Sequence, residues 1–154
     1  MHLSRRAAML LVTASVLSAC GGSSRRPEVS RSSVSGKTPE MNALVRKYAR
    51  VHDIPESLLH RVIMRESRYD AGARNGPYYG LMQILPQTAR TMGYRGSPEG
   101  LLDAETNLKY AGRYLRGAWL VSRGDEDAAV GWYARGYYYE AKRLGLLEET
   151  GLKG

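Results

Sequence analysis

Apolar residues recur at helical spacing from residue 38 to residue 144, and this pattern most limits the folds open to the chain. In the stretch after Asp103, the regularly spaced apolar residues are Leu108, Ala111, Leu115, Ala118 and Trp119. Such spacing places them on one side of a helix, where they form a buried stripe. No segment alternates apolar and polar residues as a half-buried strand would, and no internal repeat is present. The sequence therefore predicts an all-α fold, with one folded unit over residues 38–154.

Capping residues and prolines mark the expected helix ends. Thr38 and Pro39 have the residue types of an N-cap and a first helical position, and Asp103 is a candidate N-cap for the longest helix. Pro55 is expected to begin the second helix. Shorter helical pieces are predicted at 81–84, 86–92, 125–135 and 138–144, and loops at 71–79 and 93–100.

The first residues have the composition of an export signal. A basic pair, Arg5 and Arg6, precedes an apolar run at 7–17 that is too short to span a bilayer as a mature helix. The sequence Leu17-Ser18-Ala19-Cys20 resembles a bacterial lipobox, and Cys20 is the only cysteine of the chain. Lipidation explains an unpaired thiol in an exported protein. We expect residues 1–19 to be a lipoprotein signal peptide and Cys20 to carry the lipid, the alternative being an ordinary signal with an incidental cysteine.

Residues 20–37 are rich in Ser, Gly and Arg and nearly free of apolar residues, so we expect a disordered tether running from the lipidated cysteine. The domain would then work at the bacterial cell envelope. Gly21 resembles the residue that follows the cysteine in lipoproteins sent to the outer membrane, where they face the periplasm. The net charge of +8 suits an anionic partner such as membrane head groups or cell-wall carboxylates, and nucleic acid is not expected outside the cytoplasm.

Glu66 interrupts the apolar pattern of the second helix. Leu59, Val62 and Ile63 form its apolar stripe, and Glu66 falls next on that stripe. Burial raises the pKa of a carboxyl group because it disfavours the charged form. A carboxylic acid that stays protonated near neutral pH is what glycosidic cleavage requires. The position alone also fits a helix-end residue bonded to a neighbouring turn.

Other kinds of chemistry lack support in the sequence. There is no cysteine cluster and no pair of histidines at metal-ligand spacing, so no metal is expected. Ser67 lacks the glycines of a nucleophile elbow. No glycine-rich phosphate loop is present, and no cofactor is expected.

Several ordered motifs follow Glu66. The segment from Glu66 to Ala71 is followed by Gly80-Leu81-Met82-Gln83, then by Leu85 to Ala89 and by Ala111 to Leu115. Together they resemble the SLT-type lytic transglycosylases of glycoside hydrolase family twenty-three, over about residues 42–136. The resemblance implies a fold similar to goose-type lysozyme, a single helical domain with a saccharide-binding groove and one catalytic glutamate.

The resemblance also implies a reaction. The family cleaves the β-1,4 bond between N-acetylmuramic acid (MurNAc) and N-acetylglucosamine (GlcNAc) in the glycan strands of peptidoglycan. It does so without water and leaves a 1,6-anhydroMurNAc end. One glutamate acts first as acid and then as base, whereas a hydrolase normally needs a second carboxylate. Asp70 is expected to be a turn or cap residue rather than that second acid.

Residue roles are carried over from the motifs. Glu66 is the expected acid and base; Ser67, Met82, Gln83, Asn107, Tyr110 and Tyr133 are the expected substrate-binding or supporting residues. Gln83 and the backbone near Met82 are expected to contact the substrate, with Met82 lining the groove. Asn107 and Tyr110 lie with Tyr114 on a polar-aromatic stripe of the long helix.

The chain departs from the family pattern near its end. Ala134 replaces an asparagine after Tyr133, and Tyr137 to Lys142 replaces a glycine-rich ending. That tail could wall one end of the groove or pack on the domain. Two alternatives therefore stay open beside a lytic transglycosylase: a muramidase that hydrolyses the same bond, and a non-catalytic peptidoglycan-binding lipoprotein. The sequence identifies no protein partner.

Overall fold

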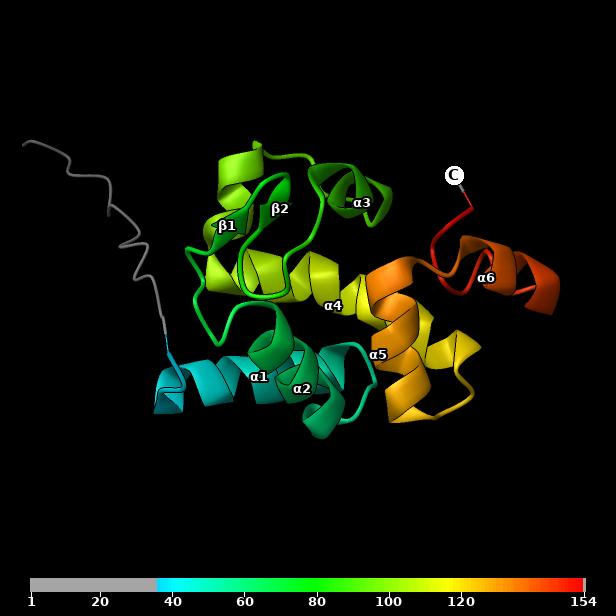
Figure 1. Ribbon diagram of the computed structural model, residues 1–154, viewed down its shortest axis with the longest axis horizontal. Coiled ribbons are helices and arrows are strands. Elements are labelled where there is room, and N and C mark those ends of the chain that lie inside the picture. The colour runs from blue at the N-terminus through cyan, green and yellow to red at the C-terminus, as the bar shows by residue number, and fades with distance from the viewer. Residues whose placement is uncertain (1–35, 154) are drawn as a thin grey trace, which may run out of the picture. The chain divides into compact units, whose positions relative to one another are not determined.

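The computed structural model describes residues 36–153, and helices make up most of this range (Figure 1). In chain order the α-helices are α1 (Pro39–Val51), α2 (Glu56–Glu66), α3 (Pro86–Thr91), α4 (Ala104–Val121), α5 (Glu126–Arg135) and α6 (Tyr138–Leu144). A 3₁₀-helix, η1 (Pro98–Leu102), precedes α4, and β1 (Arg74–Asn75) pairs with β2 (Tyr78–Tyr79) in a short antiparallel hairpin. The prediction of an all-α fold is confirmed for the described residues.

Helix α4 is the central element. It packs against α1, α3, α5, α6 and η1, and Figure 1 shows α1 on one side of it and the hairpin on the other. Its N-cap is Asp103, as predicted, because the Asp103 carboxylate accepts the N–H of Thr106 at 2.8 Å. Of the apolar stripe predicted for this helix, Leu108 and Leu115 have no exposed surface, and Trp119 is partly buried. Burial of a leucine contributes roughly 1.5–3 kcal/mol to the stability of the fold.

The first two helices pack against each other, and α1 also packs on α4. Helix α1 begins as predicted, with the Thr38 hydroxyl accepting the N–H of Met41 at 3.1 Å and with Pro39 as the first helical residue. The expected start of the second helix at Pro55 is wrong by one residue. Pro55 has an extended ψ of 135° and is the N-cap, so the first helical residue is Glu56. Because proline fixes only φ, its ring suits either position.

The segment around Met82 is a turn and not the short helix predicted at 81–84. Gln83 has a φ of +47°, which a right-handed helix does not allow. Tyr79 and Ile84 exchange main-chain hydrogen bonds of 3.1 Å across an antiparallel bridge. The loops predicted at 71–79 and 93–100 also contain regular structure, since the first holds the β-hairpin and the second runs into η1 at Pro98.

The predicted signal peptide at 1–19, the lipidation site at Cys20 and nearly all of the predicted tether at 20–37 lie outside the described residues. The last two tether residues, Gly36 and Lys37, are described. The N–H of Gly36 donates to the carbonyl of Tyr69 at 2.8 Å, and the Lys37 ammonium lies 6.0 Å from the centre of the Tyr69 ring. Within residues 36–153, no helix has both the length and the apolar character needed to cross a membrane.

Candidate active site

Glu66 is the last residue of α2, at the point where the apolar stripe of that helix ends. Its side chain is 23% exposed, and this burial raises the pKa of the carboxyl group above its ordinary value. The neighbouring Arg65 opposes the effect. The Nε of Arg65 lies 3.5 Å from Oε1 of Glu66, and its positive charge lowers the pKa of Glu66 without cancelling the increase. The geometry thus favours a proton on Glu66 at a higher pH than for an exposed glutamate.

The chain turns sharply after Glu66. The N–H of Ser67 donates to Ile63 at 3.0 Å, and Arg68 and Tyr69 follow with φ values of +53° and +67°. Asp70 accepts the N–H of Gly72 at 2.9 Å through its side chain, which makes it a turn residue as predicted. The helix therefore stops before Asp70 could share a face with Glu66.

Tyr133 of α5 is bonded to the turn that follows the hairpin and also feels the charge of Glu66. Its hydroxyl donates to the main-chain carbonyl of Met82 at 2.7 Å. Burial and the negative charge of Glu66 both raise the pKa of Tyr133, with burial the larger cause. The phenol therefore stays neutral and can keep donating. The ring of Tyr114 meets that of Tyr133 edge-on, with 5.5 Å between centroids, and fixes it further.

Asn107, at the beginning of α4, holds the turn from Gly80 to Gln83 in place. Its Oδ1 accepts the N–H of Met82 at 3.0 Å, and its Nδ2 donates to the carbonyls of Tyr79 at 2.9 Å and Leu101 at 2.8 Å. Asn107 has no exposed surface. All of its bonds in the structure serve main-chain groups, which makes it a positioning residue for this turn.

Position 80 of that turn requires glycine. Its φ is +73°, a left-handed backbone conformation that residues with a side chain rarely adopt. A Cβ atom at this position would also overlap the carbonyl oxygen of Leu101 and the side-chain nitrogen of Asn107. The close approach of Gly80 is what lets Asn107 reach Tyr79 and Met82.

Gln83 leaves one polar atom without a partner. Its Nε2 donates to the carbonyls of Ala73 at 3.1 Å and Gly80 at 2.8 Å. Its Oε1 is buried and accepts no hydrogen bond within the described chain. A buried acceptor of this kind is unfavourable unless a ligand or water donates to it.

A cavity of about 280 Å³ adjoins these residues. Its lining comes from the hairpin, the turn, α3, α4 and the end of α5, and consists of Tyr78, Gln83, Ile84, Leu85, Thr88, Tyr114, Tyr133, Ala134, Arg135 and Gly136. We call this cavity the groove. The lining contains no Asp or Glu. Glu66 is not itself a lining residue, but its negative charge raises the pKa of Tyr133, which does line the groove.

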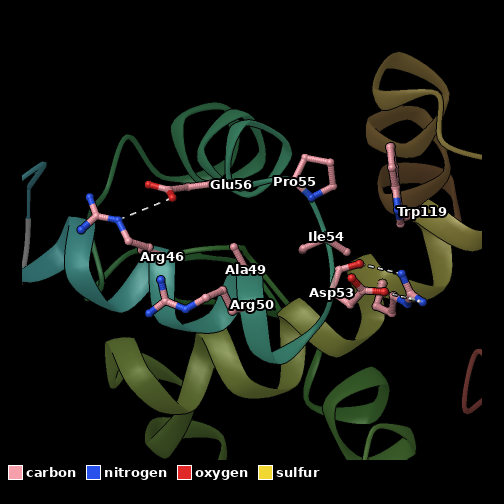
Figure 2. A pocket seen from close by; sticks show the side chains of 9 residues that line it. Arg46, Ala49, Arg50, Asp53, Ile54, Pro55, Glu56 and Trp119 are labelled. Carbon is pink, nitrogen blue, oxygen red and sulfur yellow. Dashed lines mark hydrogen bonds and ion pairs between the residues drawn. The ribbon is translucent and has the colours of Figure 1, made fainter.

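A larger cavity, of about 550 Å³, lies elsewhere, between the end of α1 and α4 (Figure 2). Two of its three arginines are paired with acids. Arg46 lies 3.6 Å from Glu56, and Arg116 lies 3.2 Å from Asp53 and donates to its carbonyl at 2.6 Å. None of the motif residues around Glu66 lines it, so size does not identify the active site here.

The family model of the transglycosylase SLT domain matches residues 43–145, which is more than half of the chain. The chain belongs to this family. No solved structure matches the chain in a search of known structures. Membership indicates a transglycosylase-type enzyme family and implies peptidoglycan as the substrate. The helical fold is the one expected of an SLT domain.

The SLT motifs converge in space, but of the predicted substrate-binding or supporting residues only Gln83 and Tyr133 line the groove. The others, which do not line it, are Ser67, Met82, Asn107 and Tyr110. The side chain of Met82 has no exposed surface, so it belongs to the core and does not line the groove. Its main chain is the part held at the site. Tyr110 packs against Tyr94, with 5.0 Å between ring centroids, and is absent from the groove lining. Contact between Tyr110 and the substrate stays a prediction, as do the binding roles of the other motif residues.

Among the groove residues of this SLT domain that were not predicted as site residues are Tyr78, Tyr114 and Arg135. The polar-aromatic stripe of the long helix contained Tyr114 beside Asn107 and offered a signal for it. Tyr78 lies in a predicted loop and Arg135 at the end of a predicted helix, and neither position gave a comparable signal. Among the residues described, no three His, Cys, Asp or Glu side chains are grouped so that they could hold a metal ion.

Proposed function

We propose that this SLT-family chain is a peptidoglycan lytic transglycosylase that cleaves the β-1,4 MurNAc–GlcNAc bond without water and leaves a 1,6-anhydroMurNAc end. One observation carries the proposal. Glu66 is a half-buried carboxyl group with a raised pKa, and its charge acts on Tyr133, which lines a groove that contains no Asp or Glu. A single carboxylate suffices for this reaction, whereas hydrolysis normally uses two.

The reaction uses Glu66 twice. The protonated carboxyl donates its proton to the glycosidic oxygen, the bond from that oxygen to the anomeric carbon C1 breaks, and GlcNAc leaves with a free hydroxyl. The Glu66 carboxylate then removes the proton from the C6 hydroxyl of MurNAc, and O6 bonds to C1. Glu66 ends protonated, and no water is consumed. The raised pKa of Glu66 supports the first step, because it keeps the acid protonated at higher pH.

The neighbouring residues support this role by fixing the groove wall. Tyr133 and Asn107 hold the main chain of Met82 from two sides. Gln83 lines the groove, and the hydrogen bonds from its Nε2 to the carbonyls of Ala73 and Gly80 fix its side chain there. Binding geometry established before the reaction reduces the barrier, since the reacting groups need no reorganisation.

The products distinguish this reaction from its alternatives. Purified sacculi are digested with the protein, and the soluble fragments are analysed by mass spectrometry. Anhydro ends, lighter by one water than reducing ends, are the expected result. Reducing muramic ends would identify a muramidase instead. Binding to sacculi with no released fragment would identify a non-catalytic binding protein.

We further propose that the domain is attached to the cell envelope through a lipid on Cys20, at the outer membrane facing the periplasm. The lipobox-like residues 17–20 and the tether composition support this. Metabolic labelling with a fatty-acid analogue tests it. Label on the wild type and none on Cys20→Ser is expected, and an unlabelled wild type would contradict the anchor.

A further inference from the structure

A third cavity, of about 420 Å³, adjoins the groove at the end of α5. Its lining consists of Trp132, Arg135, Gly136, Tyr137, Tyr138, Tyr139, Glu140 and Arg143. We call it the aromatic cavity. Arg135 and Gly136 line both the groove and the aromatic cavity, so the two cavities are neighbours at the end of α5. A polymer that extends past the groove at this end would come close to the aromatic cavity.

The tail that forms this cavity is firmly attached to the fold. Tyr137 is buried, and its hydroxyl donates to the carbonyl of Tyr114 at 2.7 Å. The rings of these two residues pack with 4.7 Å between centroids, and Ala141 on the next turn has no exposed surface. Of the two roles open from the sequence, packing on the domain is therefore the one that these contacts show, and none of residues 137–142 lines the groove itself.

Two tyrosines of the tail are exposed beside the aromatic cavity. Tyr139 is 84% exposed and Tyr138 is 46% exposed, and their rings meet edge-on with 5.4 Å between centroids. Large exposed aromatic side chains gathered in a cavity indicate a binding surface. A tyrosine offers a flat apolar face with a polar tip, which suits the C–H face and the hydroxyls of a pyranose ring.

The charges of the aromatic cavity also suit a largely neutral ligand. Arg143 is paired with Glu140 through a bond of 2.8 Å from Nε to Oε2. The guanidinium carbon of Arg135 lies 3.9 Å from the centre of the Trp132 ring, so a cation–π contact holds this side chain at the junction of the two cavities. Its N–H groups can donate to hydroxyl or acetamido oxygens passing between them.

We propose that the aromatic cavity is an additional saccharide subsite, in which Tyr138 and Tyr139 stack on a sugar of the glycan strand that continues beyond the groove. This inference rests on the proposed function for the identity of the strand. It goes further by assigning the aromatic tail, which departs from the family pattern, a preference for longer strands.

The test compares kcat/KM on tetrasaccharides and on octasaccharides of the glycan strand, using the full-length protein. The double variant Tyr138→Ala/Tyr139→Ala is expected to lose about two- to tenfold on the longer strand and to keep its activity on the shorter one. Tyr138→Phe/Tyr139→Phe retains the rings and should retain most of the preference. Val51→Ala, an exposed position on α1 that lines neither cavity, should change neither value. An unchanged length preference in the alanine variant, or an equal loss on both strands, would overturn the subsite.

Binding separates this inference from the proposed function. Calorimetry with short and long N-acetylglucosamine oligomers needs no turnover. If the wild type cleaves nothing but binds long oligomers more tightly, and the double alanine variant removes that advantage, the subsite stands and the proposed function fails. If the wild type releases anhydro products and binds both lengths equally, the subsite fails and the proposed function stands.

Discussion

The hydroxyl of Tyr133 on α5 donates a hydrogen bond to the main-chain carbonyl of Met82, 2.7 Å away and 51 residues distant in the chain. This bond joins α5 to the turn that carries Gln83. Tyr133 also lies within the influence of the Glu66 charge, which raises the pKa of its hydroxyl, and it lines the groove.

Tyr133→Phe removes that hydroxyl and leaves the Met82 carbonyl without its partner. We expect unfolding free energy to fall by about 1–2 kcal/mol, because a buried acceptor becomes unpaired. Activity on peptidoglycan should fall by about tenfold or more, since the groove wall is displaced relative to Glu66. Urea denaturation and initial rates measure the two effects.

Tyr94→Phe is the matched control. The Tyr94 hydroxyl donates to the carbonyl of Ser97, also at 2.7 Å, and Tyr94 does not line the groove. Its loss of stability should be similar while its activity stays near that of the wild type. If both variants lost activity equally, the role assigned to Tyr133 would be reduced to stability alone.

The pH dependence of activity follows from the environment of Glu66. Burial raises its pKa in the folded protein above the unfolded value, so the folded state holds the proton more tightly. The contribution of protonated Glu66 to the stability of the folded state is fully present below the unfolded pKa and is lost as pH rises through the folded pKa. The acid step needs the protonated form, so kcat/KM should decline as pH rises through the folded pKa.

Arg65→Gln should move that decline to higher pH, because the positive charge that lowers the pKa of Glu66 is gone. The pH–rate profile measures the shift. Arg46→Gln, which removes an exposed arginine of α1 paired with Glu56 at the opposite end of α2 from Glu66, should leave the profile in place. A shift toward lower pH in Arg65→Gln would contradict the assignment of Glu66 as the titrating acid.

Asn107→Ala removes the side chain that bonds to three main-chain groups around the turn. Because these groups are buried, we expect a loss of about 3 kcal/mol or more in unfolding free energy. Thr91→Val removes one exposed hydroxyl that donates to Gln87 at 3.2 Å, and it should change stability by less than about 0.5 kcal/mol. Chemical denaturation measures the unfolding free energy of both variants. Near-equal losses would contradict the anchoring role of Asn107.

Gly80→Ala and Gly76→Ala separate backbone strain from steric overlap. Both glycines have positive φ, +73° and +56°, but a Cβ at Gly76 would meet nothing within 4 Å. Gly76→Ala should therefore cost about 1–2 kcal/mol, from backbone conformation alone. Gly80→Ala adds the overlap with Leu101 and Asn107 and should cost at least about 3 kcal/mol. Thermal unfolding of the two variants would contradict this account if their midpoints agreed.

The sequence predicts those parts of the fold that depend on neighbouring residues. The N-caps Thr38 and Asp103 could be predicted because a capping side chain bonds to a main-chain group three residues later. The position of Glu66 could be predicted because helical spacing alone places it on the apolar stripe. Residues 138–144 likewise form a helix as predicted.

The parts that depend on distant partners could not be predicted. The segment 81–84 has helical composition, but Asn107 and Tyr133 take the N–H and the carbonyl of Met82. Those bonds form a turn and place the Met82 side chain in the core. Arg135 could not be predicted as a groove residue either, because that role depends on the end of α5 lying opposite Tyr78 and Thr88, which are distant in the chain.

The most direct measurement is product analysis of purified peptidoglycan treated with the wild type and with Glu66→Gln in parallel. The substituted glutamine side chain is nearly the same size as that of glutamate but can neither donate the acidic proton nor accept one. The account predicts anhydroMurNAc ends from the wild type and none from Glu66→Gln, with the variant still folded and still bound to the saccharide. Anhydro products from Glu66→Gln at the wild-type rate would contradict it.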